Sequence, residues 1–214
     1  MLRKQIISIG KEMYENKLIT GTMGNISARF PGEDKFFITP SGMDYRALEP
    51  EDIVLVNITT GTLEGKRKPS TELELHRQIY IARPDVGAIV HMHSDFATAF
   101  AVARIDLPPV TDLMAQILGG GIRVAEHALP SSPELARNAV KALGDLNGAL
   151  LANHGSVGVG ADLNKAFYAA LTVENSAKLF ILASIIGKPN FLSHELIEIE
   201  KTKIAPNYGQ GSNQ

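Results

Sequence analysis

Apolar residues recur along this chain with two different spacings, and each spacing predicts a different kind of element. Leu2, Ile6 and Ile9 lie three or four residues apart, which predicts an amphipathic helix over residues 2–16. Short uncharged runs rich in β-branched residues predict buried strands, and clusters of Gly, Pro and Asn predict the turns between them. Along the whole chain, this reasoning predicts helices over 2–16, 70–83, 95–103 and 162–186, a helix that begins at Ser132 and Pro133, and strands over 26–30, 35–39, 53–58, 86–90 and 149–152.

The order of these elements indicates the class of fold. Residues 26–30 and 35–39 flank a Pro-Gly turn and predict an antiparallel hairpin, whereas helices alternate with strands later in the chain. This order favours an α/β sandwich with a mixed, largely antiparallel central sheet. A length of 214 residues suits one domain, predicted over residues 1–200. The remaining residues, 201–214, are polar and rich in Gly and are predicted to form a mobile tail.

Composition and charge exclude several classes of function. The net charge is −2 at pH 7, so neither a nucleic acid nor an anionic membrane is an expected partner. The chain has no cysteine, so a transition metal would be bound by His and carboxylate groups, as Zn, Mn, Fe or Co are. Lys and Glu interrupt the apolar positions of the N-terminal segment, and no run of about 18 apolar residues occurs. These features predict a cytoplasmic protein.

Three histidines follow predicted strands and are candidate metal ligands. His91 and His93 end the run 86–90, and side chains two residues apart on a strand point to the same side, with their Cα atoms about 6–7 Å apart. A bare pair of this kind can also be two hydrogen-bonded histidines without a metal. His154, just after residues 149–152, makes metal binding the favoured interpretation. Three His ligands with one open position commonly hold a catalytic divalent ion such as zinc.

The start of the helix predicted over 70–83 has two interpretations. Thr71 and Glu74 have the spacing of a capping box, and Ser70 could also cap the helix. A helix N-terminus also favours anions, and Ser70 and Thr71 would add hydroxyl donors to its free N–H groups. The turns 21–25 and 39–42 offer further hydroxyls and backbone N–H groups. If the three segments converge, they would bind a phosphate group.

Five motifs, taken together, resemble the class II aldolase/adducin family. The resemblance extends from about residue 5 to 186, and more weakly to Tyr208. It implies a three-layer αβα sandwich and a homotetramer with fourfold symmetry and active sites at the subunit interfaces. The motifs are Gly21-Thr-x-Gly-Asn-x-Ser27, Thr39-Pro-Ser-Gly42, Pro69-Ser-Thr-Glu72, His91-x-His93 and Asn153-His-Gly155.

The resemblance also implies a role for individual residues. It places Zn²⁺, or Mn²⁺, Co²⁺ or Fe²⁺, on His91, His93 and His154, and the catalytic acid/base on Glu72. Tyr208 corresponds to a tyrosine that takes part in proton transfer or closes over a neighbouring site. A small phosphorylated sugar is the implied substrate. Its phosphate contacts fall on Thr22, Asn25, Ser41, Gly42, Ser70 and Thr71.

These observations predict a metal-dependent lyase that cleaves a small phosphorylated ketose to dihydroxyacetone phosphate and an aldehyde. Glu72 favours an aldolase or a dehydratase, since the related epimerases carry Asp at this position. A sugar-phosphate 4-epimerase, a dehydratase, a decarboxylase and a non-catalytic adducin-like binding module remain as alternatives. The resemblance also implies a tyrosine shortly after a proline-containing turn, as general acid for the aldehyde half of the substrate. Residues 109–116, the corresponding segment here, contain no tyrosine. The remaining histidines, His76, His127 and His194, are predicted to have no direct chemical role.

Overall fold

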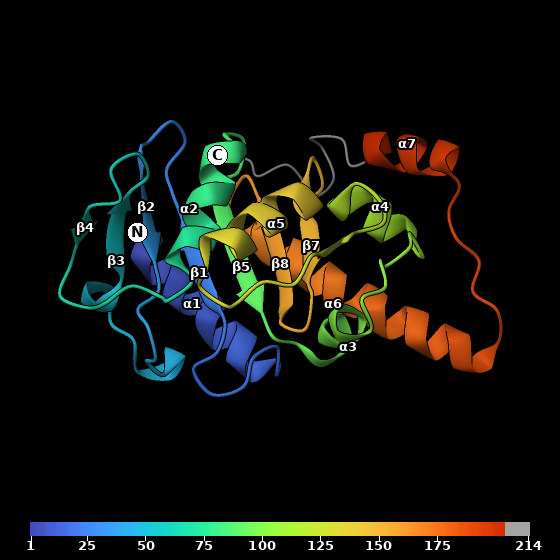
Figure 1. Ribbon diagram of the computed structural model, residues 1–214, viewed down its shortest axis with the longest axis horizontal. Helices are drawn as coiled ribbons and strands as arrows, with labels where there is room; N and C mark the ends of the chain where they lie inside the picture. The colour runs from blue at the N-terminus through green and yellow to red at the C-terminus, as the bar shows by residue number, and fades with distance from the viewer. Residues whose placement is uncertain (204–214) are drawn as a thin grey trace, which may run out of the picture.

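One eight-stranded sheet forms the centre of the protein in the computed structural model, which describes residues 1–203 (Figure 1). The strand order is β4-β3-β2-β1-β5-β8-β7-β6, and every neighbouring pair is antiparallel except β6 with β7. The mixed, largely antiparallel sheet predicted from the sequence is therefore confirmed. The strands are β1 (Asn25–Ala28), β2 (Lys35–Ile38), β3 (Val54–Asn57), β4 (Leu63–Glu64), β5 (Ala88–Met92), β6 (Val124–Ala125), β7 (Gly148–Leu151) and β8 (Gly155–Gly160).

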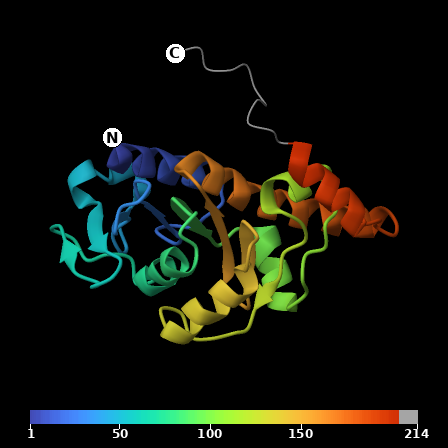
Figure 2. The same ribbon diagram turned by 90° about the horizontal axis from the view of Figure 1, so that it is seen from above.

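Helices cover both faces of this sheet and give the protein three layers, as predicted (Figure 2). Helices α2 and α5 bury their apolar residues against one face. Helices α1, α3, α4 and α6 pack against the other face. The helices are α1 (Leu2–Glu15), α2 (Leu73–Ala82), α3 (Asp95–Ala103), α4 (Asp112–Leu118), α5 (Pro133–Leu143), α6 (Leu163–Ile186) and α7 (His194–Lys203), with 3₁₀ turns at Tyr45–Ala47 and Pro50–Asp52.

Strand β5 lies near the middle of the sheet and is buried on both faces. Ile89 packs with the residues of α2, whereas Val90 and Met92 pack with those of α1 and α6. Because both faces of the strand are buried, none of its positions needs a charged residue. The uncharged run 86–90 is therefore typical of a buried strand. The alternation along the strand also places His91 on the Ile89 face, fully buried in the protein.

The sequence pattern does not predict β8, because Gly155–Gly160 contains three glycines and resembles a turn. The glycines are there because α6 packs directly on this strand. A Cβ on Gly158 would lie 2.4 Å from the backbone N of Ala170, and one on Gly160 would lie 2.5 Å from that of Ala166. A larger residue at either position would push the helix off the sheet.

Helix α6 is long and apolar enough to cross a membrane by length and composition alone, although Glu174 and Lys178 interrupt its apolar sequence. Ala166, Ala170 and Val173 pack in the core of this protein, and a core helix passes the same test. Helix α7 continues to Lys203, past the domain boundary predicted at residue 200. The division into a domain and a mobile tail stays a prediction.

Candidate active site and metal centre

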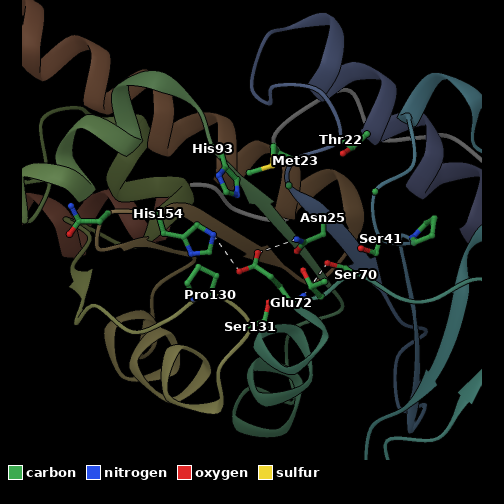
Figure 3. A pocket seen from close by; sticks show the side chains of 15 residues that line it. Thr22, Met23, Asn25, Ser41, Ser70, Glu72, His93, Pro130, Ser131 and His154 are labelled. Carbon is green, nitrogen blue, oxygen red and sulfur yellow. Dashed lines mark hydrogen bonds and ion pairs between the residues drawn. The ribbon is translucent and has the colours of Figure 1, made fainter.

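Three histidines and one glutamate from distant parts of the chain meet at one end of the sheet. His91 is on β5, His93 follows that strand, His154 lies in the β7–β8 connection, and Glu72 precedes α2. One donor atom from each residue lies within 4.8 Å of the donor atoms of the other three. Figure 3 shows Glu72 between His154 on one side and Asn25 on the other.

The β7–β8 connection has an unusual backbone that brings His154 into this group. Asn153 adopts the left-handed region, with φ of 57°, a conformation that Asn tolerates better than most residues. A Cβ on Gly155 would lie 2.3 Å from the carbonyl oxygen of Met92, so only glycine lets β8 approach β5 here. As a result, the ring of His154 lies 4.9 Å from the rings of both His91 and His93, measured between centroids.

The polar atoms of the four side chains point to a common centre. Glu72 Oε2 lies 2.8 Å from His91 Nε2, and Glu72 Oε1 lies 3.3 Å from His154 Nε2. The Nε2 atoms of His91 and His93 are 2.8 Å apart. On the far side of its ring, His91 Nδ1 lies 2.9 Å from the Ser156 carbonyl oxygen, so that Nδ1 carries the donated proton.

These donors fit a divalent cation. Glu72 Oε1 is buried and makes no hydrogen bond within residues 1–203, and its 3.3 Å approach to His154 Nε2 is an ion-pair contact only, which is costly for a closed polar cluster. Imidazole nitrogens and a carboxylate are the ligand types that Zn²⁺ and similar ions accept. The bond from His91 to the Ser156 carbonyl also orients this ring in the manner typical of metal-bound histidines.

Burial and mutual charge shift the pKa values within the group. Burial, together with the charges of its neighbours, lowers the pKa of His93 to about 3 and that of His154 to about 4. Burial also opposes ionisation of Glu72, but His91, His154 and Asn25 together hold the pKa of this carboxyl well below its usual value. Burial by itself would lower the pKa of His91, but the adjacent Glu72 carboxylate outweighs burial, and the pKa of His91 is raised. At neutral pH, Glu72 is therefore an anion, while His93 and His154 have lone pairs available for a metal.

A cavity of about 470 Å³ opens beside this cluster and contains all six predicted phosphate contacts. Three chain segments meet there because backbone hydrogen bonds join them. The N–H of Thr39 donates to the carbonyl of Ile26, which follows the 21–25 turn, at 3.0 Å. Pro40 and Pro69 form an isolated β-bridge, and the N–H of Ser70 donates to the carbonyl of Thr39 at 3.0 Å. The predicted contacts that line the cavity are Thr22, Asn25, Ser41, Gly42, Ser70 and Thr71.

The capping-box interpretation of residues 70–74 is wrong. Helix α2 begins at Leu73, its N-cap is Glu72, and no side chain caps it. Ser70 Oγ instead accepts a hydrogen bond from the Glu72 backbone N–H at 3.2 Å. The helix thus starts later than predicted, because Glu72 is drawn toward the histidines, and both Ser70 and Thr71 border the cavity.

Comparison with known proteins assigns this arrangement to a family. The model of the class II aldolase and adducin N-terminal domain matches residues 4–181. The chain belongs to this family.

Individual class II aldolases are similar over nearly the whole chain. A 5-deoxy-D-ribulose 1-phosphate aldolase of Bacillus thuringiensis serovar kurstaki is 35% identical over 97% of both chains. An L-fuculose phosphate aldolase of Escherichia coli is 34% identical, over 88% of this chain and 86% of the relative. The solved structure of an L-fuculose 1-phosphate aldolase superposes with a TM-score of 0.91 at 37% identity, over 94% of this chain and 95% of the other. The prediction of an enzyme of the class II, metal-dependent aldolase type is confirmed.

Several residues of this aldolase site could not be identified from the sequence pattern. Pro130 and Ser131 line the cavity, yet the segment before α5 predicts only a helix start. His76, predicted to be a helix-face residue near the site, is fully buried and bonded to Ser27 and Asn25. No spacing signal separates such a histidine from a core residue.

Two of the remaining histidines and two polar residues of the 109–116 segment do not line this cavity. His127 lines a different hollow, and His194 lies on α7 with its side chain 90% exposed. Thr111 caps α4, and Gln116 binds Glu200 at 2.7 Å. Tyr208, the predicted catalytic tyrosine, lies outside the described residues.

Proposed function

We propose that this aldolase cleaves the C3–C4 bond of a small ketose 1-phosphate and releases dihydroxyacetone phosphate and an aldehyde. One observation supports the proposal above all others. A single cavity joins a cradle of hydroxyl and backbone N–H donors to the Glu72 and histidine cluster. The cradle would bind the terminal phosphate of the substrate. The cluster would stabilise the negative charge that develops at the reacting carbon. The names of the relatives, which act on 5-deoxyribulose and fuculose phosphates, agree with such a substrate.

We propose Zn²⁺ as the resident ion, bound by His91, His93 and His154, with Mn²⁺, Co²⁺ or Fe²⁺ as alternatives. The ligand set is rich in nitrogen and contains no thiolate, and three histidines leave a coordination position open. When bound, the ion would act as a Lewis acid that stabilises the negative charge developing on the dihydroxyacetone phosphate half.

The phosphate cradle would hold the substrate in register with Glu72. Thr22, Ser41 and Thr71 are exposed on three different segments, whereas Asn25 and Ser70 are almost buried at the floor of the cavity. Hydroxyl and amide donors on several sides match the several oxygens of a phosphate. Because these contacts are made equally to substrate and transition state, they would govern KM more than kcat.

Glu72 would move the proton at C3 of dihydroxyacetone phosphate. Its carboxylate is ionised at neutral pH, so in the condensation direction it starts as a base. In the cleavage direction the proton returns to the same carbon. The amide of Asn25 donates to Oε2 at 3.2 Å and orients the carboxylate for this transfer.

Three further features belong to the proposal. Tyr208 would donate a proton to a substrate oxygen. The assembly would be a homotetramer whose active sites lie at the subunit interfaces. The location would be the cytoplasm, without nucleic-acid or membrane partners.

The test is a panel of phosphorylated sugars incubated with Zn²⁺-loaded enzyme. We expect dihydroxyacetone phosphate and one equivalent of aldehyde from 5-deoxyribulose 1-phosphate or L-fuculose 1-phosphate, detected with a coupled dehydrogenase and by mass spectrometry. Glu72→Gln, prepared in the same way, is the control with strongly reduced turnover. Epimerised sugar without dihydroxyacetone phosphate would favour the epimerase alternative. A metal-loaded enzyme that leaves every ketose phosphate unchanged would contradict the proposal.

A further inference from the structure

A row of buried polar side chains runs from the core of the protein to Glu72. Tyr80 lies 2.8 Å from Ser27, and Ser27 lies 2.6 Å from His76 Nδ1. His76 Nε2 contacts Asn25 Oδ1, and Asn25 Nδ2 lies 3.2 Å from Glu72 Oε2. His76 and Tyr80 are one turn apart on α2, and Asn25 and Ser27 are two apart on β1, so each pair shares a face. All five side chains are at least nine-tenths buried.

The chemistry of the donors and acceptors gives this row a single direction. The ionised Glu72 can only accept, so Asn25 must present its N–H to Glu72 and its carbonyl oxygen to His76. His76 must therefore carry its proton on Nε2 and accept at Nδ1. Ser27 then donates to His76, and Tyr80 donates to Ser27.

The orientation of the Asn25 amide is what this row controls. The Asn25 amide nitrogen has two hydrogens, and only one of them is directed at Glu72. Asn25 also lines the cavity beside Ser70 and Thr22, so its second N–H is available to an anion bound there. A flipped amide would turn its carbonyl oxygen toward both the carboxylate and the phosphate, and each contact would be repulsive.

We propose that His76 is a positioning residue that holds the Asn25 amide so that its N–H groups face both Glu72 and the substrate phosphate. The inference rests on the proposed function, because that function places the phosphate beside Asn25. It adds a link between the two ends of the cavity, since one amide serves both the carboxylate and the phosphate.

Glu72 by itself cannot hold this orientation throughout a reaction in which it gains and loses a proton. When Glu72 is protonated, its hydroxyl could donate to the amide carbonyl and stabilise the flipped form. His76 does not change in this way. Burial, more than the nearby charge of His91, lowers the pKa of His76 to about 3, and burial raises the pKa of the Tyr80 hydroxyl. His76 and Tyr80 therefore neither gain nor lose a proton over the range in which the enzyme works, and the bond from His76 to Asn25 persists while Glu72 changes its charge.

The experiment measures binding of inorganic phosphate by calorimetry in the zinc-loaded enzyme and in a graded set of variants. His76→Leu removes the bond to Asn25, and we expect phosphate affinity to fall about 5- to 100-fold. His76→Gln keeps a donor near the Nε2 position, and we expect it to stay within about 3-fold of the native protein. Ser27→Ala frees the His76 tautomer and should cost about 3- to 10-fold. Tyr80→Phe is the matched control, because Tyr80 is one hydrogen bond farther from Asn25 than Ser27 is. We expect it to lower phosphate affinity less than about 2-fold.

Metal content and thermal unfolding, recorded in parallel, separate positioning from a general loss of structure. If His76→Leu does not fold, Ser27→Ala decides the question. In an Asn25→Ala background, Ser27→Ala and His76→Leu should have no further effect on phosphate affinity, because the amide that they orient is absent. Native-like phosphate affinity in folded His76→Leu or Ser27→Ala, or equal losses with and without Asn25, would overturn the inference. A native enzyme that binds no phosphate would instead contradict the proposed function.

Discussion

The two ends of the cavity are built in different ways. The metal end rests on the central strand β5 and on the β7–β8 connection, whose backbone suits Asn153 and requires Gly155, and its four donor atoms lie within 4.8 Å of one another. The phosphate end rests on three loop segments, and most of its donors are exposed. A metal requires several donors fixed around one point, whereas a phosphate can be bound by many donors that each contribute a little. Substitutions at the metal end should therefore abolish function, and substitutions at the phosphate end should weaken it by degrees.

Loss of a histidine should have the largest effect. We expect His93→Ala to lose most of its bound zinc and essentially all activity, because two remaining histidines cannot hold the ion in an open site. The fold should persist, since a core of this size does not depend on a metal. Metal content by plasma mass spectrometry and far-UV circular dichroism test both statements. His127→Ala, an exposed histidine outside the cluster, should match the native protein. Native zinc content after His91, His93 and His154 are all replaced would show that the ion binds elsewhere.

Glu72→Gln should come next, with kcat lower by about 10²- to 10⁴-fold. The amide keeps the shape of the side chain but cannot take up the proton, so binding of inorganic phosphate should change little. Steady-state kinetics and calorimetry separate the two effects. Glu74→Gln is the matched control, because Glu74 pairs with Arg77 on the same helix and does not line the cavity. Near-native turnover in Glu72→Gln would mean that another group moves the proton.

Ser70→Ala should raise KM about 3- to 30-fold with little change in kcat, because one phosphate donor of several is lost. Ser184→Ala, an exposed serine on α6, is the control. Ser70 Oγ also accepts a hydrogen bond from the backbone N–H of Glu72. A fall in kcat without a rise in KM would therefore show that Ser70 acts mainly through Glu72 and not through the phosphate.

The smallest effect concerns pH, and it distinguishes the two ends by charge. In the metal-free protein the pKa values of His76, His93 and His154 lie at about 3, 3 and 4, below the usual value of 6.5. The unfolded chain therefore binds more protons below pH 6.5, so stability should fall as the pH decreases from 6.5 toward 4. Glu72, whose pKa is also lowered, adds to this fall at the acid end, whereas His91, whose pKa is raised, favours the folded state until the pH rises through that pKa.

Thermal unfolding in the presence of a chelator, measured between pH 4 and pH 7, tests this expectation. A His93→Ala and His154→Ala double variant should show a shallower dependence, while Ser70→Ala should keep the native slope. Equal slopes in all three proteins would show that the buried histidines do not govern acid stability.

Much of the fold and of the site could be predicted from the sequence, because local spacing carries that information. A period of three to four residues predicts α1, an uncharged run with β-branched residues predicts β5, and Pro133 marks the start of α5. The two-residue spacing of His91 and His93 predicts that both rings point to one side of the strand, as they do. The residues of the motifs could be named in advance because each motif is short and lies within one segment.

The rest was decided by tertiary structure, since it depends on contacts between segments that are far apart in the chain. β8 is a strand because α6 packs on its glycines, and no local pattern contains that helix. Glu72 precedes α2 without capping it because histidines from β5 and the β7–β8 hairpin compete for its carboxylate. His76 resembles any other helix residue in the sequence, and only the fold shows that it is buried beside Ser27 and Asn25. The sequence by itself determined which groups are available, and the packing of distant segments determined which of them meet.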